Sequence, residues 1–287
     1  MKVLVTGAGG MLAQDIVPCL LERGYEAIGL RHDDLDITDL AAVRSAAGSL
    51  EPDLVINCAA YTKVDEAETD EYRALMVNGF GVHNLCLVCQ GRDIPLVHFS
   101  TDYVFDGAKA SPYTIYDAPN PINAYGRSKL LGEKYVLWLL NKFYLVRTSW
   151  LFGLHGSNFI ETMLELGQRQ KHTSVVNDQR GCPTWTYHLA QAVVALIETG
   201  RYGVYHITNS EATTWFDFAK EIFGLSNVDI EVAPTSSDKL PRPAKRPGNS
   251  VLDPYPIPEV LGREMPSWRQ ALKEYLAQRN TVTKSGV

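Results

Sequence analysis

The first 150 residues alternate short, almost entirely apolar segments with longer segments whose apolar residues recur at helical spacing. KVLVTG (2–7), DLVINCAA (53–60) and IPLVHFS (94–100) are segments of the first kind. Continuous apolar strands are buried on both faces, as in a parallel sheet between two layers of helices. The alternation therefore predicts an α/β fold with a doubly wound parallel Rossmann sheet, in which ligands lie at the carboxyl ends of the strands.

The pattern continues less regularly in the second half, with strand-like segments at 173–178 and 203–208. We expect residues 1–150 and about 170–208 to form a dinucleotide-binding Rossmann domain. Residues about 151–169 and 209–287 are expected to form a smaller C-terminal substrate-binding domain. Seven prolines lie in 234–258, which excludes regular helix and central strand there and predicts a loop over a site.

Composition excludes several classes of protein. The net charge of −6 gives no sign of the basic patch of a nucleic-acid-binding protein. No apolar run approaches the ~20 residues that span a bilayer, so we expect no membrane association. The chain enters a strand at once, which predicts no signal peptide and a cytoplasmic location. The five scattered cysteines are typical of reduced thiols.

The stretch TGAGGMLA (6–13) joins the first predicted strand to the first predicted helix. Gly7, Gly10 and Ala13 stand three residues apart, a spacing that lets backbone N–H groups and a helix N-terminus approach a phosphate. Small residues also permit a sharp turn without any ligand. At the first strand–helix junction of an alternating chain, however, the pattern favours a dinucleotide, and we predict that Gly7 and Gly10 bind it.

The end of the second predicted strand distinguishes the two nicotinamide cofactors. An acidic residue there binds the ribose 2′-hydroxyl of NAD, and a basic residue accommodates the 2′-phosphate of NADP. Arg31 stands at this point and favours NADPH, while the nearby Asp33 and Asp34 leave NADH possible. The alternative is that Arg31 is a solvated loop charge.

Residue types suited to carbonyl reduction lie farther along the chain. Thr101 ends a predicted central strand, and Tyr125 and Lys129 lie one helical turn apart on the next helix. Reducing a ketone requires a hydride at carbon and a proton at oxygen, and a nearby ammonium lowers a tyrosine pKa from its usual value near ~10. We predict Tyr125 as general acid, Lys129 as the group that lowers its pKa and Thr101 as the group that orients the carbonyl. The alternative is a solvated pair on a helix surface.

Longer motifs carry a resemblance over nearly the whole chain. They are INCAAYTKVDEAE (56–68), STDYVFDG (100–107), NAYGRSKLLGE (123–133), RTSWLFG (147–153), NFIETML (158–164), NDQRGCPT (177–184) and KRPGNSVLD (245–253). With the glycine turn, these resemble the dTDP-4-dehydrorhamnose reductase family of the extended short-chain dehydrogenase/reductase superfamily. Arg180 departs from the pattern, because a neutral residue is usual there.

The resemblance implies further site residues. Those expected at the cofactor are Met11 and Leu12 at the pyrophosphate turn, Asp36 and Ile37 beside the adenine, and Ala59, Ala60, Tyr61, Thr62, Asn78, Tyr125 and Lys129. Those expected at the substrate are Thr101, Asp102, Trp150 and Arg246, the last as a partner of the nucleotide diphosphate. Trp150 as ordinary core and Arg246 as a loop charge are the alternatives.

The activity implied is NAD(P)H-dependent reduction of the C4 keto group of dTDP-4-dehydro-6-deoxy-L-mannose to dTDP-L-rhamnose. One alternative is another nucleotide-sugar reductase or an epimerase, which retains tightly bound NAD⁺ and consumes none. A second is a non-catalytic relative, like the regulatory subunits of methionine adenosyltransferase. Intact Thr101, Tyr125 and Lys129 argue against that reading.

No metal is expected. Cys86 and Cys89 form a CxxC pattern with His83 nearby, but the segment is typical of a buried helix and no second pair follows. Some relatives dimerise around a metal held by carboxylates, whereas WTYHLAQ (185–191) has no acid at the corresponding helix start. The expected state is therefore a monomer or a weak homodimer.

Overall fold

The structure is a computed structural model that describes residues 1–285. Its central sheet has six strands in the order β10-β5-β4-β3-β1-β2, and every pair is parallel. The strands are β1 (Lys2–Thr6), β2 (Glu26–Leu30), β3 (Leu54–Asn57), β4 (Leu96–Thr101), β5 (Phe143–Thr148) and β10 (Gly203–His206). The chain thus forms the predicted doubly wound sheet, whose order reverses between β1 and β3.

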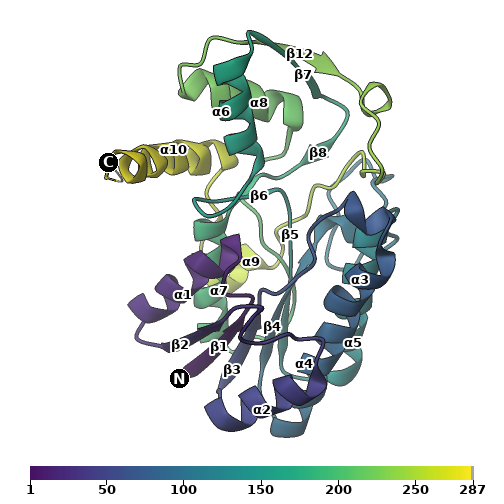
Figure 1. Cartoon of the computed structure of the whole chain (residues 1–287), viewed down its shortest axis with the longest axis vertical. Helices are drawn as coiled ribbons and strands as arrows, with labels where there is room; N and C mark the ends of the chain where they lie inside the picture. Colours follow the sequence, from purple (N-terminus) through teal and green to yellow (C-terminus); the bar gives the residue numbers. More distant parts are fainter. Residues whose placement is uncertain (286–287) are drawn as a thin grey trace.

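Helices cover both faces of this sheet, as Figure 1 shows. One apolar core lies between the sheet and α1 (Met11–Glu22), α7 (Thr186–Glu198) and α9 (Ile257–Leu261). A second lies between the other face and α2 (Leu40–Leu50), α4 (Val82–Arg92) and α5 (Ala124–Leu139). Burial on both faces explains why β3 and β4 have no exposed residue and read as unbroken apolar runs.

The helix before α4 packs unusually closely on α5. It runs through α3 (Glu71–Leu75) and a π-helical turn, η2 (Met76–Gly81), into α4. A Cβ on Gly132 of α5 would lie 2.3 Å from the carbonyl oxygen of Asn78, and one on Gly79 would lie 2.5 Å from Leu131. Glycine at both positions lets the π-helical turn, and with it the buried Asn78, meet the helix that carries Tyr125 and Lys129.

A smaller apolar core lies above the carboxyl ends of the sheet, at the top of Figure 1. It is formed mainly by α6 (Phe159–Arg169), α8 (Trp215–Leu225) and α10 (Trp268–Ser285). Its short strands pair two by two: β6 (Leu151–Phe152) with β9 (Thr184–Trp185), β8 (Arg180–Gly181) with β11 (Thr213–Thr214), and β7 (His172–Val176) with β12 (Glu231–Thr235). We placed residues from about 170 with the Rossmann domain, but β7 pairs with β12 and packs in the smaller core. The division into two functional domains remains a prediction.

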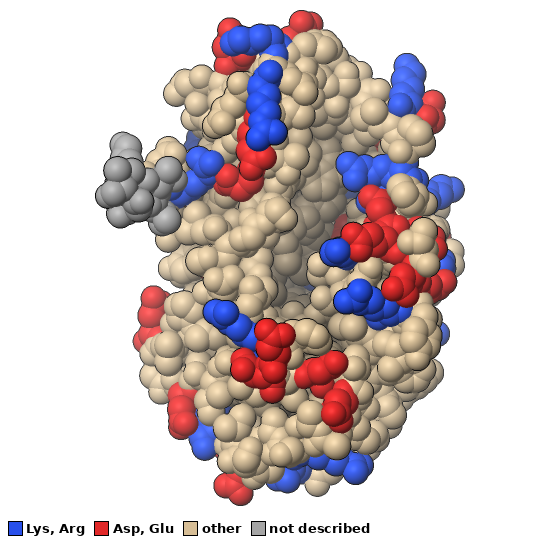
Figure 2. All heavy atoms as spheres, viewed as in Figure 1, with Lys and Arg blue, Asp and Glu red and all other residues tan. Residues whose placement is uncertain are grey.

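The proline-rich segment crosses between these two parts of the molecule. We call residues 241–253 the strap. It follows η4 (Ser237–Lys239) and passes Gly107, where a Cβ would lie 2.6 Å from the backbone nitrogen of Gly248. Figure 2 shows the surface hollowed between the smaller core and the sheet. The remaining short turns are η1 (Glu66–Glu68) and η3 (Asp102–Val104).

No helix within residues 1–285 combines the length and apolar character needed to cross a membrane. The same residues contain no group of three or more His, Cys, Asp or Glu side chains arranged to hold a metal ion. All five cysteines are free thiols.

Candidate active site

The residues predicted for chemistry meet at the carboxyl edge of the sheet. Gly7 follows β1, Ala59 follows β3, and Thr101 is the last residue of β4. Tyr125 and Lys129 lie on α5, which packs against β4. Carboxyl ends of parallel strands share one edge of a sheet, so residues far apart in sequence come together there.

The glycine turn fits a dinucleotide. Gly7 has φ +64°, and a Cβ there would lie 2.6 Å from the backbone of Ala59, so only glycine fits. Gly10 is the N-cap of α1 and places no side chain over the first N–H groups of the helix. An open helix N-terminus behind a tight turn is where a pyrophosphate binds. The side chain of Met11 lies near Gly153, where a Cβ would stand 3.0 Å from Cγ of Met11.

The residues after β2 are those predicted to lie near the adenosine part of the cofactor. Arg31 is exposed, and its side chain lies near Gly9 of the turn. Asp36 accepts hydrogen bonds from the backbone N–H and the hydroxyl of Thr38, at 2.9 and 2.8 Å, which fix this loop. Ile37 is buried against Gly81, so its side chain belongs to the core of the sheet.

Thr101 and Tyr125 lie in contact beside a buried carboxyl group. The Thr101 hydroxyl donates to Oδ1 of Asp102 at 3.0 Å and accepts from the backbone N–H of Tyr103 at 3.1 Å. The phenol of Tyr125 lies near Thr101, whose hydroxyl favours the phenolate form, and the ring of Tyr125 meets Tyr103 edge to face with centroids 6.0 Å apart. Burial, together with the negative charge of Asp102, raises the pKa of Tyr125 above its ordinary value.

Lys129 is 3% exposed, and its ammonium donates a hydrogen bond to the carbonyl oxygen of Phe99 at 2.6 Å. Burial lowers the pKa of Lys129 to about 8, against opposing effects of Glu133 and Cys58. We expected Lys129 to lower the pKa of Tyr125. In the structure the pKa of Tyr125 is raised instead, because burial and the charge of Asp102 dominate at the phenol.

Asn78 connects the cofactor side of the site to α5. Its amide accepts from the backbone N–H of Tyr61 and donates to the carbonyl of Tyr61, both at 2.9 Å. It also donates to the hydroxyl of Ser128 at 2.9 Å, which donates in turn to the carbonyl of Tyr125 at 2.7 Å. Ser128 had no role in the sequence analysis, and here it couples the loop after β3 to the tyrosine.

A fully buried ion pair lies behind Lys129. Arg147 of β5 donates two hydrogen bonds to the carboxylate of Glu133 of α5, Nε to Oε1 at 2.9 Å and Nη2 to Oε2 at 2.7 Å. The side chains are 4% and 0% exposed. The guanidinium also lies over the ring of Phe105 and 3.4 Å from Nε2 of His206. This pair ties α5 to the sheet, and sequence reasoning missed it because the partners lie on different elements.

Trp150 lies between β5 and β6 in a left-handed conformation, with φ +49°. Its ring stacks on Trp215 at a centroid distance of 3.6 Å and an interplanar angle of 5°. A Cβ on Gly181 would lie 2.4 Å from the Trp150 ring, so glycine is needed there. Trp215 was not among the predicted site residues. By stacking on Trp150, which was predicted, it fixes the orientation of the Trp150 ring.

Arg246 lies in the strap, paired with Asp65 of the loop after β3. Its Nη2 donates to Oδ2 of Asp65 at 2.9 Å, and its charge acts on the nearby phenol of Tyr103. We predicted Arg246 as a partner of a diphosphate. In the structure the charged partner of Arg246 is Asp65, a carboxylate of the chain itself.

Asp102 makes folding stability pH-dependent. Burial raises the pKa of Asp102 from 3.8 to about 7. Between these values the folded state binds more protons than the unfolded state, so the contribution of Asp102 to stability falls as pH rises. We expect Asp102→Asn to remove this loss, so that the variant gains stability relative to wild type as pH rises from about 4 to about 7. Urea unfolding at several pH values measures this, and a difference independent of pH contradicts it.

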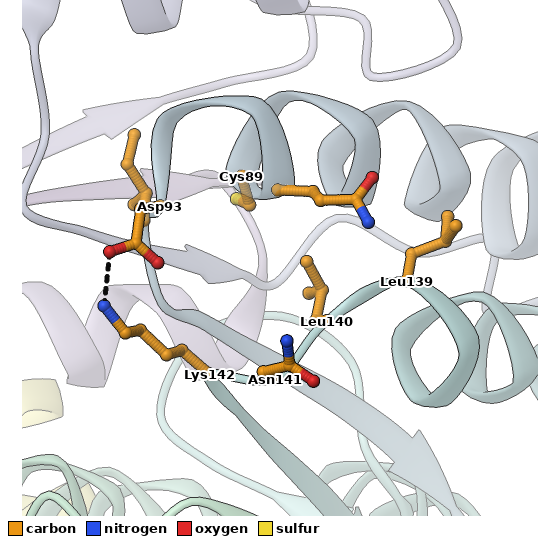
Figure 3. A pocket seen from close by; sticks show the side chains of 8 residues that line it. Cys89, Asp93, Leu139, Leu140, Asn141 and Lys142 are labelled. Atoms are coloured by element: carbon orange, nitrogen blue, oxygen red, sulfur yellow. Dashed lines mark hydrogen bonds and ion pairs between the residues drawn. The ribbon is translucent and has the colours of Figure 1, made fainter.

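A small pocket lies at the opposite edge of the sheet (Figure 3). It has a volume of about 70 Å³ and lies between the end of α4 and the start of β5. Asp93 and Lys142 form an ion pair at its rim, with N–O at 2.5 Å. It is separate from the strand ends that carry the predicted residues, and we assign it no function.

Comparison with known proteins agrees with this geometry. Residues 1–281 match the family described as RmlD substrate binding domain. The chain is 46% identical over 251 residues to a dTDP-4-keto-6-deoxy-D-glucose reductase of Streptomyces niveus, covering 87% of each chain. Its fold matches a dTDP-4-dehydrorhamnose reductase of Clostridium acetobutylicum, with TM-score 0.94, 42% identity and coverage of 97% and 99%. It also matches the Bacillus anthracis dTDP-4-dehydrorhamnose reductase in complex with NADP, with TM-score 0.93, 38% identity and coverage of 96% and 99%.

A doubly wound parallel sheet whose glycine turn faces a tyrosine and a lysine one helical turn apart is the arrangement of the extended short-chain dehydrogenase/reductases. Members of this superfamily use nicotinamide cofactors, and those named dTDP-4-dehydrorhamnose reductases are oxidoreductases. Within that superfamily, the chain belongs to the RmlD family, the family of the dTDP-4-dehydrorhamnose reductases.

Proposed function

We propose that the protein reduces the C4 keto group of dTDP-4-dehydro-6-deoxy-L-mannose with NADPH, forming dTDP-L-rhamnose. The observation that carries the proposal is the meeting of Thr101, Tyr125 and Lys129 at the edge of the sheet that also holds the glycine turn. Relatives named for 4-keto sugar reduction support the substrate class.

The cofactor would be held by backbone and small side chains. Its pyrophosphate fits the turn at Gly7 and Gly10, where no side chain blocks the start of α1. The other proposed contacts are Met11, Leu12, Arg31, Asp36, Ile37, Ala59, Ala60, Tyr61, Thr62 and Asn78. NADPH, when bound there, supplies the hydride for the carbonyl carbon.

The proton comes from the protein. Tyr125 holds its proton at neutral pH because its pKa is raised, and it donates this proton to the oxygen at C4 as the carbonyl becomes an alcohol. Thr101 donates a hydrogen bond to the same oxygen, for which its hydroxyl turns away from Asp102. Lys129 is largely protonated below its pKa of about 8 and stabilises the phenolate left behind. In this way it opposes the effect of Asp102 and lowers the pKa of Tyr125 during the reaction.

The sugar and its nucleotide would occupy the hollow between the sheet and the smaller core. Asp102 and Trp150 are the proposed contacts to the sugar, and Arg246 is the proposed partner of the diphosphate. We propose a cytoplasmic protein that acts as a monomer or a weak homodimer and binds no nucleic acid.

The test is the loss of NADPH absorbance on addition of dTDP-4-dehydrorhamnose, with the product identified by NMR. We expect stoichiometric NADPH oxidation and a single product, dTDP-L-rhamnose. Absence of NADPH oxidation with this sugar and with other 4-keto nucleotide sugars would show that the chain is not a reductase of this class.

A second candidate is reduction of dTDP-4-keto-6-deoxy-D-glucose itself. The observation in its favour is the 46% identity to the Streptomyces niveus reductase of that name. Reduction at C4 follows the same steps for both proposed substrates. The two sugars differ in the configuration of other ring substituents, which would lie near Trp150. Supplying each substrate separately, without an epimerase, distinguishes them by which one oxidises NADPH.

Arg31 is expected to set the cofactor preference. Replacing it with alanine removes the cation that would meet the 2′-phosphate, which we expect to raise the KM for NADPH about tenfold, on the order of one charge-assisted contact. The KM for NADH should change by less than about twofold, since NADH has no 2′-phosphate. An equal change in the KM for NADPH and for NADH would show that Arg31 does not recognise the 2′-phosphate.

A further inference from the structure

One carboxylate holds the strap to the Rossmann part of the molecule. Asp65 accepts from the backbone N–H of Ala244 at 3.1 Å, from Nη1 of Arg242 at 3.3 Å and from both Nη atoms of Arg246, with Nη2–Oδ2 at 2.9 Å. The Arg246 guanidinium holds the pKa of Asp65 down to about 2, so this carboxylate is charged at any working pH. We call Asp65 and residues 242–246 the clasp.

The two ends of the strap are held differently. Residues 249–253 are fixed by backbone hydrogen bonds, among them Ser250 N to Arg180 O and Tyr113 N to Val251 O, both at 2.8 Å. Residues 242–246 are held through side chains, by Asp65 and by the amide of Asn123, which donates to the carbonyl of Lys245 at 2.9 Å. A change of charge at Asp65 therefore acts on one end of the strap and leaves the other end in place.

The clasp reaches the residues proposed for catalysis through two neighbouring side chains, Asn123 and Tyr103. Asn123 also caps α5, accepting from the N–H of Gly126 at 2.7 Å, and Tyr125 lies between these two residues. The charge of Arg246 acts on the phenol of Tyr103, whose ring packs edge to face on Tyr125. The contacts made by Asp65 and Asn123 thus determine where the guanidinium of Arg246 lies relative to Tyr125.

The two arginines of the clasp differ in exposure. The side chain of Arg246 is 14% exposed, and that of Arg242 is 67% exposed. A guanidinium has five N–H donors. Nη1 of Arg246 also donates to the carbonyl oxygen of Ala244, so the N–H groups left free by Asp65 and Ala244 are the ones available to a phosphate. A guanidinium that is already ordered avoids the entropy cost of ordering a long side chain when the ligand binds.

We propose that Asp65 is a positioning residue for the nucleotide-sugar substrate, fixing Arg246 and the strap so that the free N–H groups of Arg246 meet the diphosphate. This inference rests on the proposed function. It assigns Asp65 a part in substrate affinity, separate from the proton transfer at Tyr125.

Asp65→Asn tests the proposal, because the amide keeps the shape of the side chain and removes its charge. We expect the KM for the nucleotide sugar to rise about tenfold, equivalent to about 1.4 kcal/mol, and kcat to stay within about twofold. The matched control is Asp93→Asn, which removes the ion pair with Lys142 at the opposite edge of the sheet (Figure 3). Asp93 has φ +57°, which asparagine tolerates, so this variant should leave KM and kcat unchanged.

The rate of tryptic cleavage measures how firmly residues 242–246 are held, in the absence of any substrate. The bonds after Arg242 and Arg246 precede proline and resist cleavage, so Lys239 and Lys245 are the cleavable sites of this segment. We expect Asp65→Asn to speed cleavage after Lys245, inside the clasp. Cleavage after Lys239, outside it, should keep its wild-type rate.

Exchanging the charges of Asp65 and Arg246 distinguishes a role in positioning Arg246 for the substrate from a purely structural ion pair. Asp65→Arg combined with Arg246→Asp restores the ion pair, so protease resistance should return, but the KM should stay high because the diphosphate then faces a carboxylate. Return of the wild-type KM would show that Arg246 has only a structural role. A KM lowered by Asp65→Asn would show that Asp65 competes with the diphosphate, and this too overturns the proposal.

Binding of dTDP alone, measured by calorimetry, separates failure of this inference from failure of the proposed function. If wild type binds dTDP and Asp65→Asn binds it equally well, the positioning role is wrong and the reductase proposal stands. We expect Asp65→Asn to weaken dTDP binding about tenfold and Asp93→Asn to leave it unchanged.

Discussion

Tyr125→Phe is expected to lower kcat for carbonyl reduction by roughly 10²–10⁴-fold, the usual contribution of a positioned general acid. The substitution removes one hydroxyl and keeps the ring, so the edge-to-face contact with Tyr103 and the packing of α5 should remain. Because the lost interaction forms as the oxygen gains its proton, kcat and kcat/KM should fall together. NADPH oxidation under saturating substrate measures the effect.

The matched control for this variant is Tyr135→Phe. Tyr135 lies on the same helix, with its ring beside Phe80, His83 and Trp138. It should keep wild-type kcat. NADPH binding, followed by fluorescence, should be retained in Tyr125→Phe, since the glycine turn is untouched. Undiminished turnover in Tyr125→Phe would remove the tyrosine from the mechanism and require a different proton donor.

Arg147→Met is expected to destabilise the fold by about 3–5 kcal/mol, the usual cost of leaving one member of a buried ion pair without its partner. Glu133 is fully buried, and both of its carboxylate oxygens accept from this guanidinium. That cost is a large share of the ~5–15 kcal/mol by which proteins are stable. The free energy of unfolding in urea measures the loss.

A double-mutant cycle tests the cause of this loss. Glu133→Leu together with Arg147→Met removes both charges, and this variant should be more stable than Arg147→Met alone because no carboxylate remains buried without a partner. Arg127→Met is the exposed counterpart, since Arg127 pairs with Glu71 at 44% and 40% side-chain exposure, and it should cost less than about 1 kcal/mol. Equal losses in the single and double variants would locate the cost in packing at Arg147.

The meeting of most of the candidate catalytic residues at one edge of the sheet could be predicted from the sequence. Unbroken apolar strands predict a parallel sheet, a parallel sheet has one carboxyl edge, and the residues that end its strands meet there. Thr101 and the glycine turn follow from this rule, and the helical spacing of Tyr125 and Lys129 puts both on one face of α5. These inferences need only local pattern and the topology that the pattern implies.

The less accurate predictions concern contacts between distant segments. Strand β7 ends in two valines like a strand of the central sheet, and its pairing with β12 depends on where the chain returns 59 residues later. Likewise, a lysine one helical turn from a tyrosine predicts a lowered tyrosine pKa only if no stronger effect opposes it, and burial of the phenol and the charge of Asp102 both do.

The sequence by itself determined the doubly wound sheet, the glycine turn and the placement of Tyr125 and Lys129 on one face of α5, because each is encoded in a short stretch with its own periodicity or spacing. Only the tertiary structure decided the partners of these groups: Asp65 for Arg246, Trp215 for Trp150 and Glu133 for Arg147. Charge attraction and ring stacking act through space, over a few ångströms, whatever the separation along the chain. Which residues come within that range is set by the fold as a whole.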